Sequence, residues 1–224
     1  MTLSTGTNSQ KKAKLGFSLL AAFLIAVSAL LLFGWLSEEV FEGETETFDA
    51  FVRNGVHQFA TPGLTHILQA FSVFGSVAVV TSLCLSVICG LFFLQHASSA
   101  RLLAITMVGA GGLDIGLKHA FHRARPVAFF GMSPGSYSFP SGHALGSLCF
   151  YGALAAILSA RAPGRGTKVC IWMGAAALIA MIGLSRIYLG VHYPSDVIAG
   201  YCAAAAWVGM VAFVHRTVSG ASGT

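Results

Sequence analysis

The chain has 224 residues, of which 55% are hydrophobic and only 9% are charged, whereas ordinary soluble domains carry roughly a quarter charged residues. So few charges could not cover a water-facing surface, and a net charge of +5 is too modest to indicate a nucleic-acid partner. The composition therefore predicts a single all-α membrane domain whose solvent is lipid.

Six apolar segments are long enough to cross a bilayer, which takes about 20 residues. The first, about 15–36, follows a polar segment (1–14) that we expect to be a disordered tail. It exceeds the roughly 7–15 apolar residues of a cleaved signal peptide, so we interpret it as an uncleaved helix. The others lie at about 72–95, 102–121, 142–160, 169–190 and 196–214. The sequence thus predicts one six-helix domain over residues 15–215, followed by a short tail at 216–224.

The connection between the first two spans carries most of the acidic charge. Residues 37–62 hold six of the eight carboxylates in the chain. Within it, the apolar positions of 48–59 recur at near-helical spacing. This pattern favours an amphipathic helix on the membrane surface, with a simple loop as the alternative that the sequence leaves open.

Basic residues set the expected orientation, because Lys and Arg concentrate on the cytoplasmic side of membrane proteins. Six spans place both termini on the same side. Eight of the thirteen Lys and Arg fall on that side: Lys11, Lys12, Lys14, Arg101, Arg161, Arg165, Lys168 and Arg216. We therefore expect both termini in the cytoplasm and the opposite face toward the periplasm or exterior of the cell membrane.

Ionisable groups next to or inside membrane spans are costly and mark function by default. They gather in three segments: 118–126 closes the third span, 140–143 opens the fourth, and 185–196 joins the fifth to the sixth. The alternation of the spans brings all three segments to the non-cytoplasmic face. The sequence therefore predicts one site there.

The residue types of this site suit phosphate. Lys118, Arg125 and Arg186 are three cations, and the guanidinium fork matches phosphate oxygens. Ser141 and Gly142 open the fourth span, and a helix N-terminus binds anions through its free N–H groups. Gly142 would also let the backbone approach a ligand closely, while Ser141 could bind phosphate, cap the helix, or do both.

Two histidines supply the expected chemistry. His192 and Asp196 are four residues apart, so the carboxylate can orient the imidazole and leave its other nitrogen free to attack phosphorus. His143, on the opposite wall, can donate a proton to the leaving oxygen. These roles require a neutral His192 and a protonated His143.

The same residues carry a family resemblance. Lys118 with Arg125-Pro126, then Pro140-Ser141-Gly142-His143, then Ser185-Arg186 with His192 and Asp196 resemble, at every position, the three-part signature of the type 2 phosphatidic acid phosphatase family. The resemblance covers about residues 110–200. It implies a six-helix fold, a phosphohistidine intermediate at His192 and no metal or other cofactor. The implied substrates are phosphatidic acid, phosphatidylglycerophosphate or polyprenyl pyrophosphate.

Alternative functions differ in what they require. A phosphotransferase that passes the phosphoryl group to another lipid would use the same intermediate, and the sequence does not separate it from a hydrolase. A non-catalytic lipid transporter would give no reason for a His–Asp pair opposite a second histidine. A metal-dependent phosphatase would need more carboxylates near the site, and the vanadium haloperoxidases that share the signature are soluble. No obligate protein partner is indicated, and the partners we expect are the bilayer and the lipid phosphate substrate.

Three further ionisable residues lie near the signature or within its segments. For His122 and Arg123 we favour a surface position. Asp114 lies one helical turn before Lys118, and the sequence leaves open whether it pairs with that lysine or with another helix.

Overall fold

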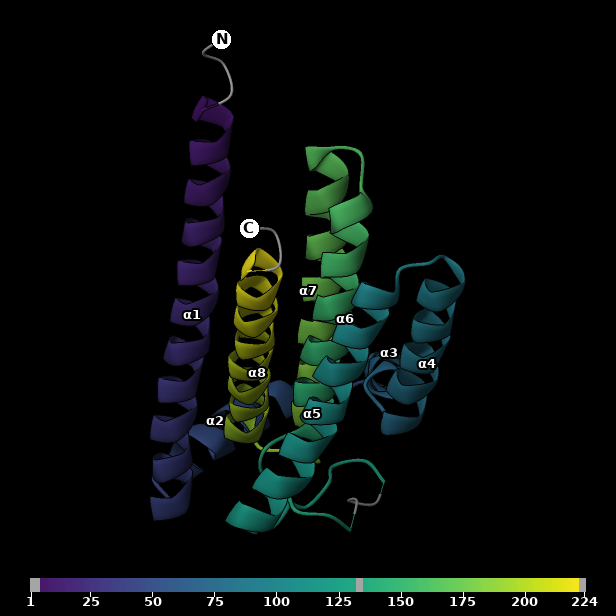
Figure 1. Ribbon diagram of the computed structural model, residues 1–224. Coiled ribbons are helices and arrows are strands. Elements are labelled where there is room, and N and C mark those ends of the chain that lie inside the picture. Colours follow the sequence, from purple (N-terminus) through teal and green to yellow (C-terminus); the bar gives the residue numbers. More distant parts are fainter. Residues whose placement is uncertain (1–4, 132–134, 222–224) are drawn as a thin grey trace.

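A computed structural model describes residues 5–131 and 135–221 (Figure 1). Within these ranges the chain forms eight α-helices and no strand. They are α1 (Thr5–Glu42), α2 (Glu46–His57), α3 (Pro62–Phe74), α4 (Val77–Phe93), α5 (Ala97–Phe121), α6 (Gly142–Arg161), α7 (Arg165–Tyr188) and α8 (Pro194–Ala221).

Five of these helices, α1 and α5 to α8, are long and apolar enough to cross a membrane, and α3 with α4 makes a sixth crossing if the pair counts as one span. The expected single helix at 72–95 is therefore wrong. The chain breaks at Gly75 and Ser76, and the two helices are bent by 48°. Sharp bends of this kind occur at Gly/Ser pairs. Ser76 begins α4 as its N-cap, with its hydroxyl accepting from the Val79 N–H.

The ends of the chain also differ from expectation. Helix α1 begins at Thr5, so residues 5–14 continue a helix in place of the disordered tail that their polarity suggested, and residues 1–4 lie outside the described part. Helix α8 runs into the expected tail as far as Ala221. Helix α1 also continues past the apolar run to Glu42.

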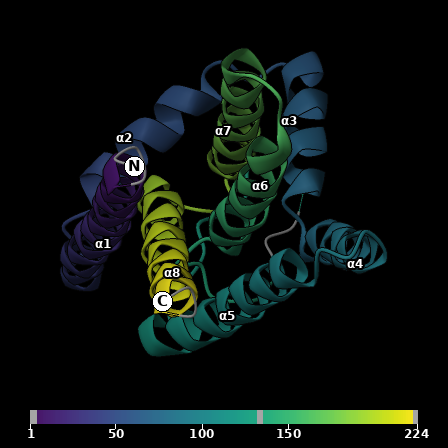
Figure 2. The same cartoon turned by 45° about the horizontal axis from the view of Figure 1, so that its top comes forward.

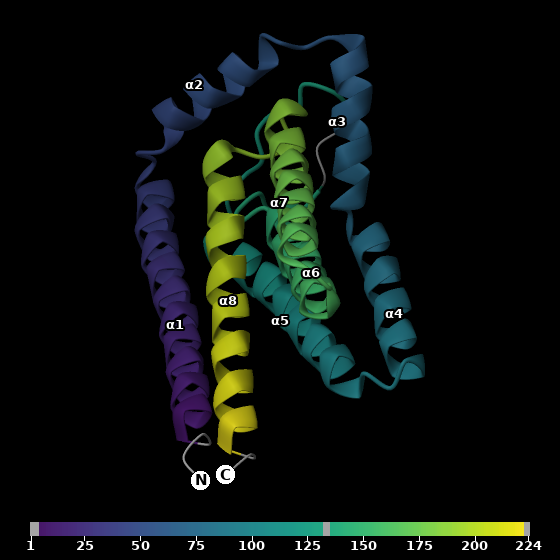
Figure 3. The same ribbon diagram turned by 90° about the horizontal axis from the view of Figure 1, so that it is seen from above.

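Helix α2 confirms the helical alternative for the acidic connection. It lies across one end of the bundle and joins α1 to α3 (Figure 3). Phe51 is 78% exposed on its outer face, whereas Asp49 is completely buried on its inner face. The helix is amphipathic, with one carboxylate on the side that faces the protein.

Helix α6 occupies the middle of the bundle, with α5, α7 and α8 packed around it (Figure 2). Its buried side chains Leu145 and Cys149 pack with the small residues Ala203 and Ala204 of α8. On its other side, Phe150 and Tyr151 pack with Ile182 of α7. This close packing fixes the relative positions of the ends of α6, α7 and α8.

All three polar segments meet at the end of the molecule where α2 lies. Helices α5 and α7 end there, while α6 and α8 begin there (Figure 1). Helices α1 and α8 run side by side, and their outer ends, near the two termini, lie at the opposite end. The convergence expected from the alternation of the spans is therefore present in the structure.

Candidate active site

A cavity of about 320 Å³ lies at this end, between the α3–α4 break, α5 and α6. Six of the eight predicted site residues line it: Lys118, Arg125, Gly142, His143, Arg186 and His192. The remaining two, Ser141 and Asp196, are completely buried close to these residues. The structure thus brings the predicted residues together at one place.

His192 lies in the short turn between α7 and α8 and is almost completely buried. Its Nε2 lies 2.9 Å from Arg125 Nη1, and its Nδ1 lies 3.3 Å from Asp196 Oδ2. A guanidinium can only donate hydrogen bonds, so Nε2 is the acceptor and the ring proton belongs on Nδ1. This tautomer leaves the Nε2 lone pair directed at Arg125, and both side chains line the cavity.

The charge state of His192 follows from its surroundings. Burial lowers the pKa of His192 to about 4, and the positive charges of Arg125 and Arg186 act in the same direction. The hydrogen bond to Asp196 opposes this change only in part. The imidazole is therefore neutral at neutral pH, as a nucleophile must be.

Asp196 is held by three donors. Its Oδ2 accepts from the Tyr193 N–H at 2.9 Å as well as from His192, and its Oδ1 accepts from Arg123 Nη1 at 2.7 Å. The bond to Tyr193 links a side chain in the first turn of α8 to the backbone just before it, as in a capping box. The local structure of the helix start thus places the carboxylate beside His192.

Arg125 comes from the connection between α5 and α6. Its Nη1 donates to the Val191 carbonyl at 2.8 Å, and its Nε and Nη2 donate to the carbonyl and hydroxyl of Ser136. Burial lowers the pKa of Arg125 below its ordinary value, and the charges of Asp196 and Asp114 offset this only in part. These bonds hold the guanidinium against Nε2 of His192.

Lys118 and Asp114 form an ion pair on α5, with Lys118 Nζ at 2.6 and 2.7 Å from the two carboxylate oxygens. This answers the open question about Asp114. Gly142 lies directly against this pair, since a Cβ there would come within 2.6 Å of Asp114 Oδ1 and 2.9 Å of Lys118 Nζ. A larger residue at this position would have to displace the side chains of the ion pair.

Arg186 projects from the last turn of α7 and is 7% exposed. Its Nη1 donates to the Ser72 hydroxyl of α3. Among the described residues its buried Nε has no hydrogen-bond partner. A buried guanidinium that lines a cavity is suited to an anionic ligand.

Ser141 caps α6, because its hydroxyl accepts from the Ala144 N–H and its own N–H donates to the Asp196 carbonyl at 2.9 Å. His143 follows in the first turn of α6 and faces the same cavity as His192. The cap fixes the helix N-terminus beside His143, so both line one wall of the site.

The expectation of a surface position is wrong for Arg123. Its Nη1 donates to Asp196 Oδ1 and to Ser195 Oγ at 2.7 and 2.8 Å, and its Nη2 donates to Asp49 Oδ2 at 2.8 Å. Burial would lower the pKa of Arg123, but the two carboxylates raise it above its ordinary value. His122, in contrast, is exposed as expected.

Asp49 was not predicted as a site residue. It shares a helical face with the apolar Val52 and Val56 of α2. A lone carboxylate on the apolar face of an amphipathic segment is the signal that could have found it.

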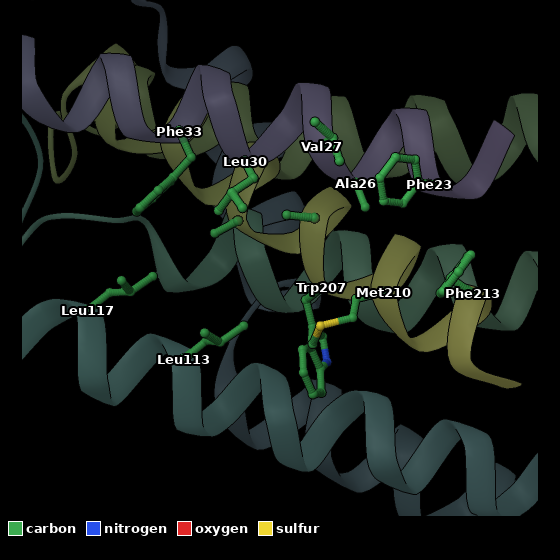
Figure 4. Close-up of a pocket in the computed structure, with 12 residues that line it drawn as sticks. Phe23, Ala26, Val27, Leu30, Phe33, Leu113, Leu117, Trp207, Met210 and Phe213 are labelled. Atoms are coloured by element: carbon green, nitrogen blue, oxygen red, sulfur yellow. The ribbon is translucent and has the colours of Figure 1, made fainter. Parts of the chain in front are cut away.

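A second cavity, of about 390 Å³, lies between α1, α5 and α8 (Figure 4). It is lined by apolar side chains such as Phe23, Leu113, Trp207 and Phe213. None of the residues that line it is ionisable. It therefore offers no ionisable side chain to an anionic ligand, in contrast to the first cavity.

The sequence profile of the PAP2 superfamily matches residues 99–219, more than half of the chain. The chain belongs to the PAP2 superfamily. Phosphatidylglycerophosphatase B of Bacillus subtilis (strain 168) is 26% identical over 176 residues, which cover 78% of this chain and 87% of that protein. The lipid A 1-phosphatase of Rhizobium johnstonii is 37% identical over 119 residues, 49% of this chain and 44% of that protein.

Solved structures support the same assignment at the level of the fold. The crystal structure of a transmembrane PAP2 type phosphatidylglycerolphosphate phosphatase from Bacillus subtilis matches with a TM-score of 0.79 and 23% identity. The match covers 86% of this chain and 96% of that one. LpxE of Aquifex aeolicus matches with a TM-score of 0.52 and 22% identity over 75% of this chain and 93% of that one.

These findings identify the protein as an integral, multi-pass membrane enzyme of the PAP2 lipid phosphate phosphatases. The family membership that the signature residues indicated is thus confirmed.

Proposed function

We propose that this enzyme hydrolyses a membrane lipid phosphate or pyrophosphate through a phosphohistidine at His192. The observation that carries the proposal is the orientation of His192, with Nδ1 toward Asp196 and Nε2 toward Arg125, which is one of three basic residues that line the cavity. A neutral imidazole whose lone pair is directed at a basic residue of the cavity is suited to attack a phosphate bound by that residue.

The phosphate would be bound by Lys118, Arg125, Arg186 and the N-terminus of α6 at Ser141 and Gly142. The burial of the Arg186 guanidinium beside the cavity supports this assignment, since a buried cation is stabilised by an anionic partner. The hydrogen bond from Arg125 to His192 Nε2 also supports this assignment. A bound phosphate would accept the hydrogen bonds of the guanidinium, and the Nε2 lone pair would then be free for attack.

In the first step, the Nε2 lone pair of His192 forms the P–N bond while the P–O bond to the lipid breaks. His143 donates its proton to the departing oxygen. In the second step, His143 takes a proton from water, whose oxygen attacks phosphorus. The P–N bond then breaks, which gives inorganic phosphate and returns both histidines to their initial states.

We further propose that this reaction needs no metal ion. Each carboxylate near the cavity is already engaged by a cation, Asp114 by Lys118 and Asp196 by Arg123. The positive charge that a metal ion would supply to the phosphate is available from the three basic side chains.

The site is proposed to face the periplasm or exterior, since eight of the thirteen Lys and Arg fall on the other side. The relatives named above suggest the substrate class: a phosphorylated lipid whose phosphate lies at the membrane surface.

The experiment is phosphate release by the enzyme purified in detergent. The substrates are phosphatidylglycerophosphate, phosphatidic acid, a lipid A phosphate and a polyprenyl pyrophosphate, each with and without a strong chelator. We expect release from at least one lipid, unchanged by the chelator and abolished in His192→Ala. Activity that disappears with chelator and returns with magnesium would contradict the metal-free mechanism, and no release from any lipid phosphate would contradict the function.

A further inference from the structure

A chain of polar side chains, with its carboxylates buried and Arg123 partly buried, runs from His192 to the surface helix α2. His192 Nδ1 contacts Asp196 Oδ2, Asp196 Oδ1 accepts from Arg123 Nη1 at 2.7 Å, and Arg123 Nη2 donates to Asp49 Oδ2 at 2.8 Å. Both carboxylates have no exposed surface. The chain connects the expected nucleophile to a helix outside the signature segments.

We propose that Arg123 and Asp49 are positioning residues for His192: Asp49 holds the Arg123 guanidinium, and Arg123 fixes the Asp196 carboxylate that orients the imidazole. This inference rests on the proposed role of His192 as the nucleophile. It assigns a part in catalysis to α2, which carries none of the residues that contact phosphate.

The donors to Asp196 are divided between its two carboxylate oxygens. Arg123 occupies Oδ1 of Asp196, so Oδ2 is left for His192 and for the Tyr193 N–H. The terminal torsion of an aspartate has a broad energy minimum. Without Arg123 the carboxylate could turn, and the Nδ1 proton of His192 would lose its acceptor.

Asp49 determines how Arg123 shares its charge. One guanidinium lies between two buried carboxylates, and each of those would be costly without a partner. With Asp49 as a second acceptor, the two terminal nitrogens of Arg123 bind different carboxylates, and its positive charge is divided between them. Asp196 therefore keeps part of its negative charge for the imidazole.

Asp49 also contacts the start of α8, which leads to a competing explanation. Its Oδ1 accepts from the Ser195 N–H at 2.9 Å, and its Oδ2 accepts from the Ser195 hydroxyl at 2.6 Å. A carboxylate at a helix N-terminus stabilises the helix. Asp49 could therefore serve stability alone, and a test must separate this from positioning.

A double-mutant cycle makes that separation. Phosphate release is measured for Asp49→Asn, Asp196→Asn and the double variant, as kcat per mole of monodisperse, folded enzyme and as KM. Asp49→Asn is expected to lower kcat by roughly 10- to 100-fold, the range found for outer hydrogen-bond partners of metal-bound imidazoles, with KM unchanged within about threefold. Asp196→Asn should lower kcat by about 10⁴-fold, as for the aspartate of a catalytic triad.

The decisive comparison is the double variant. If Asp49 acts through Asp196, the double variant should have the kcat of Asp196→Asn within about twofold, because the acceptor that Asp49 serves has already been altered. A role in stability alone would leave kcat per folded enzyme unchanged in Asp49→Asn. A role independent of Asp196 would make the two losses multiply. Either result would overturn the proposal.

Glu46→Gln is the matched control, because it removes the same charge from an exposed position on the same helix. It should keep the unmodified kcat and KM. If Asp49→Asn does not fold, Arg123→Lys completes the same cycle, since lysine keeps the charge but cannot bond both carboxylates as a fork. The reference is the unmodified enzyme: no phosphate release from it contradicts the proposed function, whereas full activity of Asp49→Asn contradicts this inference alone.

Discussion

At the active site, His192 and His143 would act on the same phosphate through different bonds, and the leaving group separates their contributions. General acid catalysis is worth about 10²–10⁴-fold, and a lipid alkoxide needs all of it because it is strongly basic. Nitrophenolate leaves without a proton. His143→Ala should therefore lose about 10²–10⁴-fold in first-turnover cleavage of a lipid phosphate, and much less in nitrophenolate release from p-nitrophenyl phosphate. Equal losses would leave His143 as a phosphate-binding residue only.

The pH dependence reports on the nucleophile. Burial lowers the pKa of His192 to about 4, and only the neutral imidazole can attack. Activity should be retained as the pH falls below 6.5, the ordinary value for histidine, and should be lost as the pH falls through about 4. The measurement is the acidic limb of kcat/KM, corrected for titration of the phosphate of the substrate. A limb centred near pH 6.5 would contradict a buried, neutral His192.

Sequence alone could identify the signature residues but not all of their supports. The convergence of the signature residues at one face was predictable because their spans alternate in direction. These residues include Lys118, Arg125, His143, Arg186 and His192. The role of Arg123 was not, because its partner Asp49 lies 74 residues away on a helix whose path across the bundle no local pattern specifies. The contact of Asp49 with Ser195 bridges 146 residues, and such pairings depend on the assembled bundle.

At the scale of elements, the break between α3 and α4 forms part of the cavity wall. An added Cβ at Gly75 would meet Ile182 Cγ2 at 2.4 Å and His143 Cδ2 at 2.9 Å. Space is the constraint here, since φ at Gly75 is −92° and open to any residue. The apolar run at 72–95 hid this break because Gly75 and Ser76 interrupt its helix without interrupting its hydrophobicity.

Gly75→Ala should therefore impair both folding and activity. Overpacking costs about 1–3 kcal/mol, and displacement of the His143 ring should lower kcat on lipid phosphate. Gly90→Ala is the matched control, because an added Cβ there meets nothing within 4 Å and alanine favours the helix. The midpoint temperature of thermal unfolding and kcat should both be lowered in Gly75→Ala and unchanged in Gly90→Ala. Equal behaviour of the two variants would show that the break has no packing constraint.

At the scale of the whole molecule, the proposed orientation places the site and α2 outside the cytoplasm. In a background without native cysteines, Glu44→Cys, between α1 and α2, should react with a membrane-impermeant thiol reagent in intact cells. Thr167→Cys, in the first turn of α7 at the opposite end, should react only after the membrane is opened. Both positions are exposed. The reverse pattern would invert the topology.

The covalent intermediate is the central claim, and rapid quenching tests it most directly. Enzyme mixed with ³²P-labelled lipid phosphate and quenched within the first turnover should carry label that is stable to alkali and lost in acid, on the peptide that contains His192. His192→Ala should carry none. In His143→Ala, p-nitrophenyl phosphate should release about one nitrophenolate per active site and leave most of the enzyme as the phosphohistidine form, because the base for its hydrolysis is missing. Label on another residue, or full turnover without any labelled enzyme, would contradict the account.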